Sequence, residues 1–113
     1  MLINYSVKVK SGQHQIVTGD VDLSNNTNLR GIWLENLDIT SMDIRNGNNS
    51  FINNFYATNN PNLTCIFADD SAYSTANWTN VDATSTFIET EAECTALSTD
   101  NTELQENYEK VVV

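Results

Sequence analysis

A short apolar pattern returns several times between residues 21 and 70. Its form is apolar-x-x-apolar-x-apolar, so its last two apolar positions alternate with other residues, as in a strand with one buried face. Asn-rich segments that favour turns separate the copies. The pattern therefore predicts very short strands joined by polar corners. The clear copies are Leu29/Ile32/Leu34, Ile39/Met42/Ile44, Ile52/Phe55/Ala57 and Leu63/Ile66/Ala68, after a weaker copy, Thr18/Val21/Leu23.

The spacing of the copies predicts how the strands are arranged. The copies begin at positions 18, 29, 39, 52 and 63. Every second copy therefore recurs at an interval typical of leucine-rich repeats, whose period is about 20–29 residues. Each coil would hold two strands on two sides, and its apolar positions would point inward and stack on those of the next coil. A single coil could not bury these side chains alone.

The amino-acid sequence of the repeats resembles that of one known family. Residues 21–29 (VDLSNNTNL) and 39–44 (ITSMDI) are similar to the two halves of the 21-residue leucine-rich repeats of secreted bacterial surface proteins. Residues 57–94 resemble the last repeat and the C-terminal cap of that family, and the likeness covers roughly two thirds of the chain. The resemblance implies a mainly β, short leucine-rich-repeat-like solenoid in a secreted or cell-surface protein.

We divide the chain into four parts. An N-terminal hairpin or capping strand pair is expected at 1–17, the solenoid coils at 18–68, a C-terminal cap at 69–94, and an acidic linker or weak helix at 95–113. The hairpin rests on alternating apolar residues over 3–9, followed by a Ser-Gly turn signal. Such a hairpin would cover the first coil, whose strand edges and apolar side chains are otherwise open.

The cap is predicted from a change of pattern after the last repeat. Asp69 and Asp70 are good N-cap residues, and residues 71–78 could form one or two helical turns. Trp78 would then plug the last coil, because a terminal coil must be covered by something large and apolar. A short strand is expected within 84–88.

Cys65 and Cys94 are the two cysteines of the chain. An even count in a small Asn/Thr-rich chain is compatible with one disulfide in an oxidising compartment, although two buried thiols would give the same sequence. The resemblance of this segment to the family's cap favours the disulfide.

Charge and hydropathy exclude some classes of partner. The chain carries 15 acidic and five basic residues, a net charge of −10, which argues against binding a phosphate backbone and therefore against a nucleic-acid partner. No apolar stretch approaches the length that crosses a bilayer, so no membrane span is expected. The first residues lack the basic and apolar regions of a signal peptide, so any export signal would lie outside this sequence.

The variable residue between the last two apolar positions of each repeat should face outward, and these residues define the candidate sites. Trp33 and Tyr56 would lie on adjacent coils of one side, where an aromatic pair could stack on a sugar ring or anchor a protein partner. The alternative is a pair that only stabilises its own ladder. Asp22 and Asp43 would pair on the other side and are weak calcium candidates, with a solvated carboxylate ladder as the alternative.

We expect no enzyme and no cofactor, because strand faces offer no recessed site and the sequence has no catalytic motif of known spacing. The leading hypothesis is a non-catalytic extracellular or cell-surface module that binds a protein or carbohydrate, with Trp33 and Tyr56 as its ligand-binding residues. The alternative is a capping or spacer end of a longer repeat protein with no ligand of its own. We also expect self-association through the open end of the solenoid.

Overall fold

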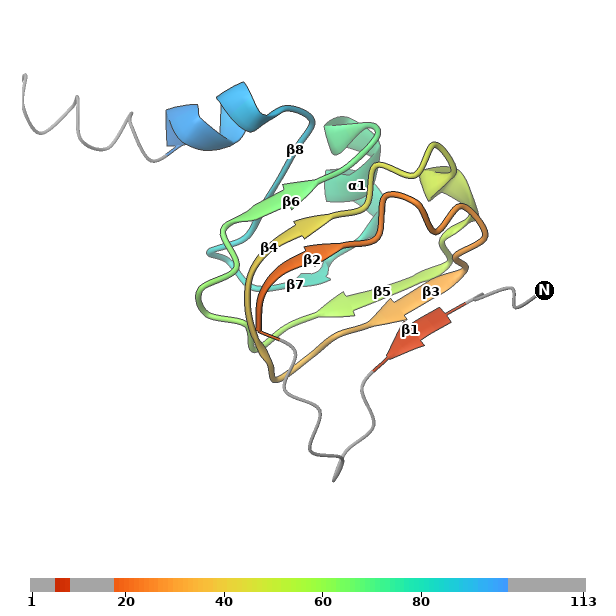
Figure 1. Ribbon diagram of the computed structural model, residues 1–113, viewed down its shortest axis with the longest axis horizontal. Coiled ribbons are helices and arrows are strands. Elements are labelled where there is room, and N and C mark those ends of the chain that lie inside the picture. Colours follow the sequence, from red (N-terminus) through yellow and green to blue (C-terminus); the bar gives the residue numbers. More distant parts are fainter. Residues whose placement is uncertain (1–5, 9–17, 98–113) are drawn as a thin grey trace, which may run out of the picture.

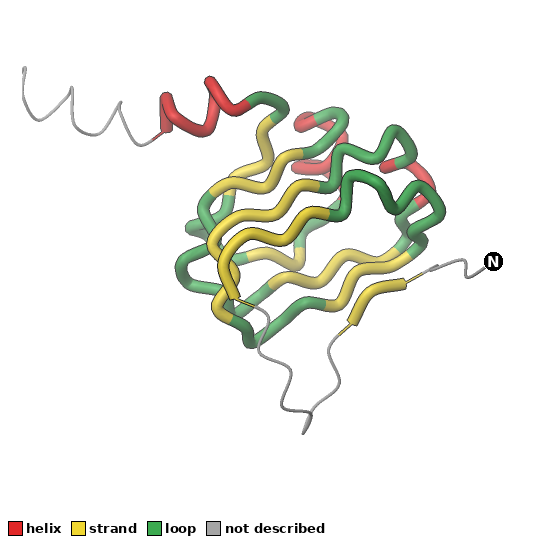
Figure 2. Tube along the Cα trace, in the orientation of Figure 1, coloured by secondary structure: helices red, strands yellow, loops and turns green. Residues whose placement is uncertain are grey.

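The computed structural model describes residues 6–8 and 18–97 of the 113-residue chain. Over these residues the protein is mainly β, with two four-stranded sheets and few helical segments (Figures 1 and 2). All neighbouring strands run parallel. The mainly β class predicted from the short apolar repeats is therefore confirmed.

Consecutive strands alternate between the two sheets. We call them the odd and the even sheet, because one has the order β1-β3-β5-β7 and the other β2-β4-β6-β8. Neighbouring strands of one sheet are thus separated in the sequence by one strand of the other sheet. The odd sheet consists of β1 (Ser6–Lys8), β3 (Gly31–Trp33), β5 (Asn54–Ala57) and β7 (Asn80–Val81), and the even sheet of β2 (Thr18–Asp22), β4 (Asp38–Asp43), β6 (Cys65–Phe67) and β8 (Thr86–Ile88).

The register of the strands follows the repeats in the sequence. Ile32 lies opposite Phe55 in the odd sheet, and Val21, Met42 and Ile66 form a row in the even sheet. Each of these residues is the middle apolar position of its repeat, and the partners come from alternate copies of the pattern. Sequence spacing therefore predicts which strands become neighbours.

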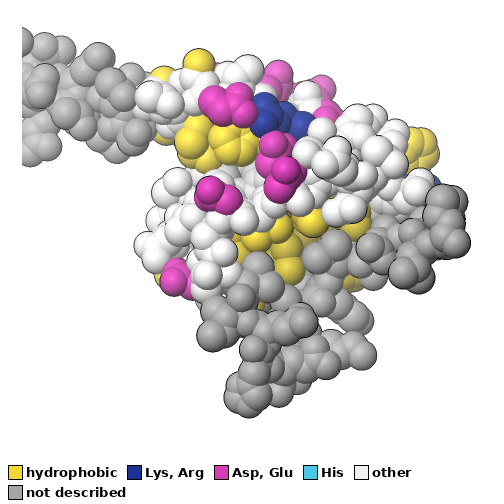
Figure 3. Space-filling model, in the orientation of Figure 1, with side chains coloured by type: hydrophobic (Ala, Val, Ile, Leu, Met, Phe, Trp, Pro, Cys, Tyr) yellow, Lys and Arg dark blue, Asp and Glu magenta, His cyan; other side chains and the backbone are white. Residues whose placement is uncertain are grey.

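The core lies between the two sheets. Figure 3 shows apolar side chains in this space, and every apolar residue of the four clear repeats is buried. Aliphatic side chains fill most of it, and near β7 and β8 the core ends in an aromatic cluster. There Trp78 is 3 % exposed and stacks on Phe55, with ring centroids 4.8 Å apart, while Phe87 meets both rings edge-on at 5.7 Å.

The polar corners contain the left-handed backbone that their composition predicts. Asn36 and Asn59 both have a φ of 60°, and Gly47 has a φ of 80°. Asn tolerates this region better than most residues because its short side chain bonds locally, and Gly has no Cβ to clash. The two Asn corners follow Leu34 and Ala57 at the same distance along the chain, so they are equivalent positions of alternate copies of the repeat.

The segment after the last repeat begins as expected. Helix α1 (Ser71–Asn77) has Asp70 as its N-cap, whose carboxylate accepts hydrogen bonds from the backbone N–H groups of Ala72 and Tyr73. Tyr73 packs edge-on against Trp78. A 3-10 turn, η1 (Asn49–Phe51), precedes β5, and residues 91–97 form a further short helix.

The expected N-terminal hairpin lies mostly outside the described residues. Its described part, β1, pairs in parallel with β3 and so forms the edge of the odd sheet. Alternation over 3–9 predicts a strand, but the period of two is the same for a strand in a hairpin and a strand in a parallel sheet. The linker or weak helix expected at 95–113 is described only to residue 97, and that part is helical.

Candidate functional site

Trp33 and Tyr56 lie side by side on the outer face of the odd sheet. They occupy opposite positions of β3 and β5, next to the buried row of Ile32 and Phe55, and alternation along the strands turns them away from the core. Their ring centroids are 6.1 Å apart and their planes differ by 13°. Both side chains are partly exposed. Sequence reasoning therefore placed this pair on one face and on adjacent strands correctly.

Gly31 sets the position of the Trp33 indole. A Cβ at Gly31 would lie 2.3 Å and 2.4 Å from the Cζ3 and Cη2 atoms of Trp33, well inside van der Waals contact. The indole edge thus rests over the glycine backbone, two residues back along the same face of β3. Any other residue at this position would push the ring away from it.

Polar groups surround the two rings. Asn80 lies opposite Tyr56 in β7, and Asn54 lies two residues before Tyr56 on the same face; both are exposed. Beyond the rings, Thr58 donates a hydrogen bond of 2.6 Å from its Oγ1 to Oε2 of Glu35. The outer face of the odd sheet therefore combines two aromatic rings with amides, a hydroxyl and a carboxylate.

Asp22 and Asp43 lie opposite each other on the outer face of the even sheet, as predicted. Each already has a donor: Ser24 donates from its N–H and its hydroxyl to Asp22 Oδ1, and Arg45 lies 2.7 Å from Asp43 Oδ2. The hydrogen bonds from Ser24 lower the pKa of Asp22. Within residues 6–8 and 18–97, no three His, Cys, Asp or Glu side chains are grouped as a metal ion requires.

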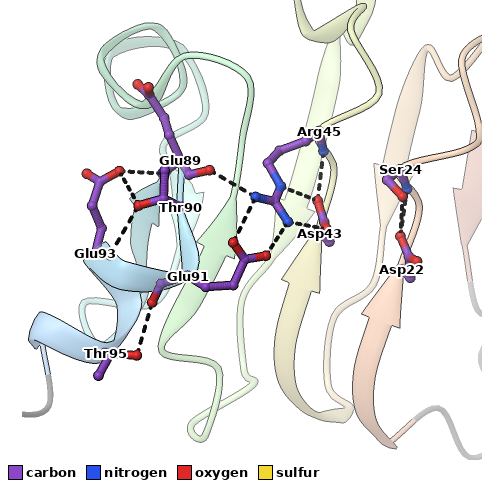
Figure 4. Close-up of polar contacts among 9 residues, drawn as sticks. All are labelled: Asp22, Ser24, Asp43, Arg45, Glu89, Thr90, Glu91, Glu93 and Thr95. Atoms are coloured by element: carbon purple, nitrogen blue, oxygen red, sulfur yellow. Dashed lines mark hydrogen bonds and ion pairs between the residues drawn. The ribbon is translucent and has the colours of Figure 1, made fainter.

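Arg45 is the centre of the polar cluster drawn in Figure 4. Its guanidinium bridges Asp43 and Glu91, at 2.7 Å and 2.8 Å, and donates to the backbone oxygen of Glu89. It also lies 4.7 Å from the centroid of the Phe67 ring. Hydrogen bonds from Arg45 lower the pKa of both carboxyl groups, and the two carboxylates raise the pKa of Arg45. The cluster joins the even sheet to the last helical segment.

A disulfide joins the same two parts. Cys65 and Cys94 form it, with their Cα atoms 5.9 Å apart, which confirms the pairing favoured by the resemblance. Glu91 and Cys94 are three residues apart in the 91–97 helix, so they share one of its faces. Two independent links, one covalent and one ionic, therefore hold this helix on the even sheet.

Sequence reasoning missed the ion pair and the start of this helix. Nothing in the spacing of Arg45 and Glu91 signals a contact over 46 residues. The helix start had a signal: Thr90 and Glu93 have capping-box spacing, and Thr90 Oγ1 accepts a hydrogen bond from the Glu93 N–H.

No protein-family model, no curated protein and no solved structure was found to match the chain. In the part of the chain that the structure describes, no helix has the length and apolar character to span a bilayer.

Proposed function

We propose that the chain is a non-catalytic binding module of the leucine-rich-repeat type that acts outside the cell or at its surface. Its ligand, a protein or a carbohydrate, would bind to the outer face of the odd sheet. Trp33 and Tyr56 would make the main contacts. The parallel strands that alternate between two sheets, and the regular return of the apolar pattern along the chain, are compatible with a short solenoid of this type.

The observation that carries the proposal is the position of the aromatic pair. Trp33 and Tyr56 are partly exposed, whereas the aromatic residues Phe55, Trp78 and Phe87 are buried and fill the end of the core. Exposed Trp and Tyr side chains supply large contact areas at a low cost in side-chain entropy, and they are enriched where proteins bind partners. A disulfide is typical of oxidising compartments, which supports an extracellular location.

The test is a screen of the purified protein against extracellular-matrix proteins and glycans. We expect binding that falls at least tenfold in the Trp33→Ala/Tyr56→Ala double variant while its circular dichroism spectrum is unchanged. Phe51→Ala is the matched control, because Phe51 is an aromatic residue with 53 % exposure that lies outside the pair, in η1. Ligands that bind wild type and the double variant equally would refute the assignment to this face.

A second candidate is a structural end of a longer repeat protein. It is favoured by the way the last coil is covered: Trp78 closes the core, and the disulfide and Arg45 fasten residues 91–97 over the even sheet. This arrangement would protect the final strands without any ligand. A complete lack of binding in the screen would favour this candidate.

A further inference from the structure

We propose that the ligand of the odd-sheet face is a neutral glycan, and that chains bearing sulfate or carboxylate groups are rejected. This inference rests on the proposed function, because it names the ligand class of the same site. Four observations carry it: the two rings, the polar groups around them, the limited apolar area and the charge of the protein.

The rings provide a narrow apolar platform. With planes only 13° apart and centroids separated by 6.1 Å, Trp33 and Tyr56 present similarly oriented surfaces on adjacent strands. Gly31 leaves room for the indole against the strand, and the two rings already lie in this arrangement without a ligand. A preformed platform favours binding, because less side-chain entropy is lost. The C–H faces of pyranose rings suit such aromatic surfaces.

The polar groups around the rings can bind the hydroxyl groups of a sugar. Asn54 and Asn80 are exposed, and their amides can each donate and accept hydrogen bonds. The carboxylate of Glu35 lies two residues beyond Trp33 along the chain, and a hydrogen bond from Thr58 to its Oε2 holds it in place. Hydroxyl groups are both donors and acceptors, so amides and a carboxylate around an apolar centre are suitable partners for them.

The apolar area on this face is small for a protein partner. A stable protein interface buries about 800 Å² on each side, and its centre is apolar. Around Trp33 and Tyr56, the positions on β3, β5 and β7 and just after β5 are held by Gly31, Asn54, Asn80 and Thr58, and β7 is only two residues long. On the other side of β3, Lys8 of β1 is the residue opposite Trp33. Two rings in a polar surround fit a sugar chain better than the centre of a protein interface.

Charge decides between classes of glycan. The chain has a net charge of −10, and near the rings the carboxylate of Glu35 is set against one lysine, Lys8, opposite Trp33 in β1, so the overall charge of the protein remains strongly negative. Like charges repel over about 8 Å at physiological salt, so sulfated or uronate-rich chains would be disfavoured as they approach. A neutral glycan carries no such penalty.

The inference can be tested by affinity electrophoresis in native gels that contain one polysaccharide each. The neutral probes are β-glucan, mannan, dextran and chitin oligosaccharides, and the anionic probes are dextran sulfate, polygalacturonate and hyaluronan. Dextran and dextran sulfate form a pair that differs only in charge. The protein variants are wild type, Trp33→Ala/Tyr56→Ala, Gly31→Ala and the control Phe51→Ala.

We expect at least one neutral probe to retard wild type and Phe51→Ala alike, with affinity reduced at least tenfold in the double variant. Gly31→Ala should also weaken retardation, because it keeps both rings but displaces the indole. Retardation by anionic probes in place of neutral ones would overturn the inference, as would equal retardation of the double variant. If the protein binds a protein ligand and no glycan, and the double variant loses this binding, the glycan inference is refuted and the proposed function stands. If the double variant keeps its binding to both glycans and proteins, both the inference and the proposed function are refuted.

Discussion

At the scale of single residues, buried asparagines stabilise the corners between strands. Asn60 is fully buried, and its Nδ2 donates to the backbone oxygens of Leu34 and Ala57, at 2.7 Å and 3.0 Å. Its Oδ1 accepts from the Leu37 N–H at 3.1 Å. One side chain thus satisfies backbone groups of its own corner and of the corner that follows β3. Burial without these bonds would be costly.

Replacing Asn60 with Ala should therefore destabilise the protein by at least about 2 kcal/mol, because each buried group left unpaired costs about 1–3 kcal/mol. Urea unfolding followed by circular dichroism measures this loss. Asn62→Ala is the control, since Asn62 is exposed and bonded to Asp38 at 3.2 Å, and it should cost no more than about 0.5 kcal/mol. Equal losses in the two variants would show that the buried bonds of Asn60 do not stabilise the corner.

Ser74 presents the opposite case. Its side chain is fully buried in α1, and its hydroxyl has no hydrogen-bond partner among the described residues. Ser74→Ala removes an unpaired polar group and improves helix propensity, so we expect a gain of about 0.5–1.5 kcal/mol. Thermal unfolding would detect it, and a loss of stability in the variant would imply a partner for the hydroxyl.

At the scale of elements, the 91–97 helix depends on contacts with the even sheet, because seven residues are too few to form a stable helix alone. Arg45 supplies several of these contacts at once, through Asp43, Glu91 and the oxygen of Glu89. Removal of Arg45 should therefore loosen this helix before it affects the strands.

The Arg45 cluster also predicts a dependence on pH. The pKa values of Asp43 and Glu91 are lowered in the folded protein, so their contribution to stability is present above the unfolded values of about 4 and is lost as pH falls through the folded values. At pH 7, Arg45→Met should cost roughly 1 kcal/mol. The gap in Tm between wild type and variant should narrow as the pH falls below about 4. A gap that stays constant over this range would contradict the role of the ion pairs.

The elements also show what the sequence could predict. The repeat spacing predicted the strand partners, because apolar rows such as Val21, Met42 and Ile66 must stack to be buried. The same logic placed Trp33 beside Tyr56. It could not find the Arg45–Glu91 pair or the bonds of Asn60, because such contacts depend on how corners and the cap fold in three dimensions. Periodicity reports which side of a strand is buried and carries no information on these contacts.

At the scale of the whole molecule, the disulfide ties the end of the described chain to the third strand of the even sheet. Cys65 and Cys94 are 29 residues apart, and a loop of this length is worth about 3–4 kcal/mol in the chain-entropy estimate. For a small domain this is a large share of the free energy of unfolding.

We therefore expect Cys65→Ser/Cys94→Ser to lower the free energy of unfolding by about 3–4 kcal/mol. Hydrogen exchange should show that the double substitution speeds the exchange of backbone amides in 91–97 more than that of amides in β4 and β6. A reducing agent should destabilise wild type by a similar amount and leave the double variant unaffected, which serves as the control. A loss below about 1 kcal/mol would mean that other contacts suffice to hold the cap.

The central claim is that ligands bind at Trp33 and Tyr56 on the odd-sheet face, and the two tryptophans of the chain allow a direct test. Each gives one indole N–H signal in the NMR spectrum of isotope-labelled protein: Trp33 is partly exposed, whereas Trp78 is buried and serves as an internal control. On titration with chitin oligosaccharides and with oligosaccharides of the other neutral glycans named above, we predict that the Trp33 signal shifts and saturates while the Trp78 signal stays in place. Binding that leaves the Trp33 signal unmoved would contradict this claim, and no shift with any of these probes would contradict the glycan inference.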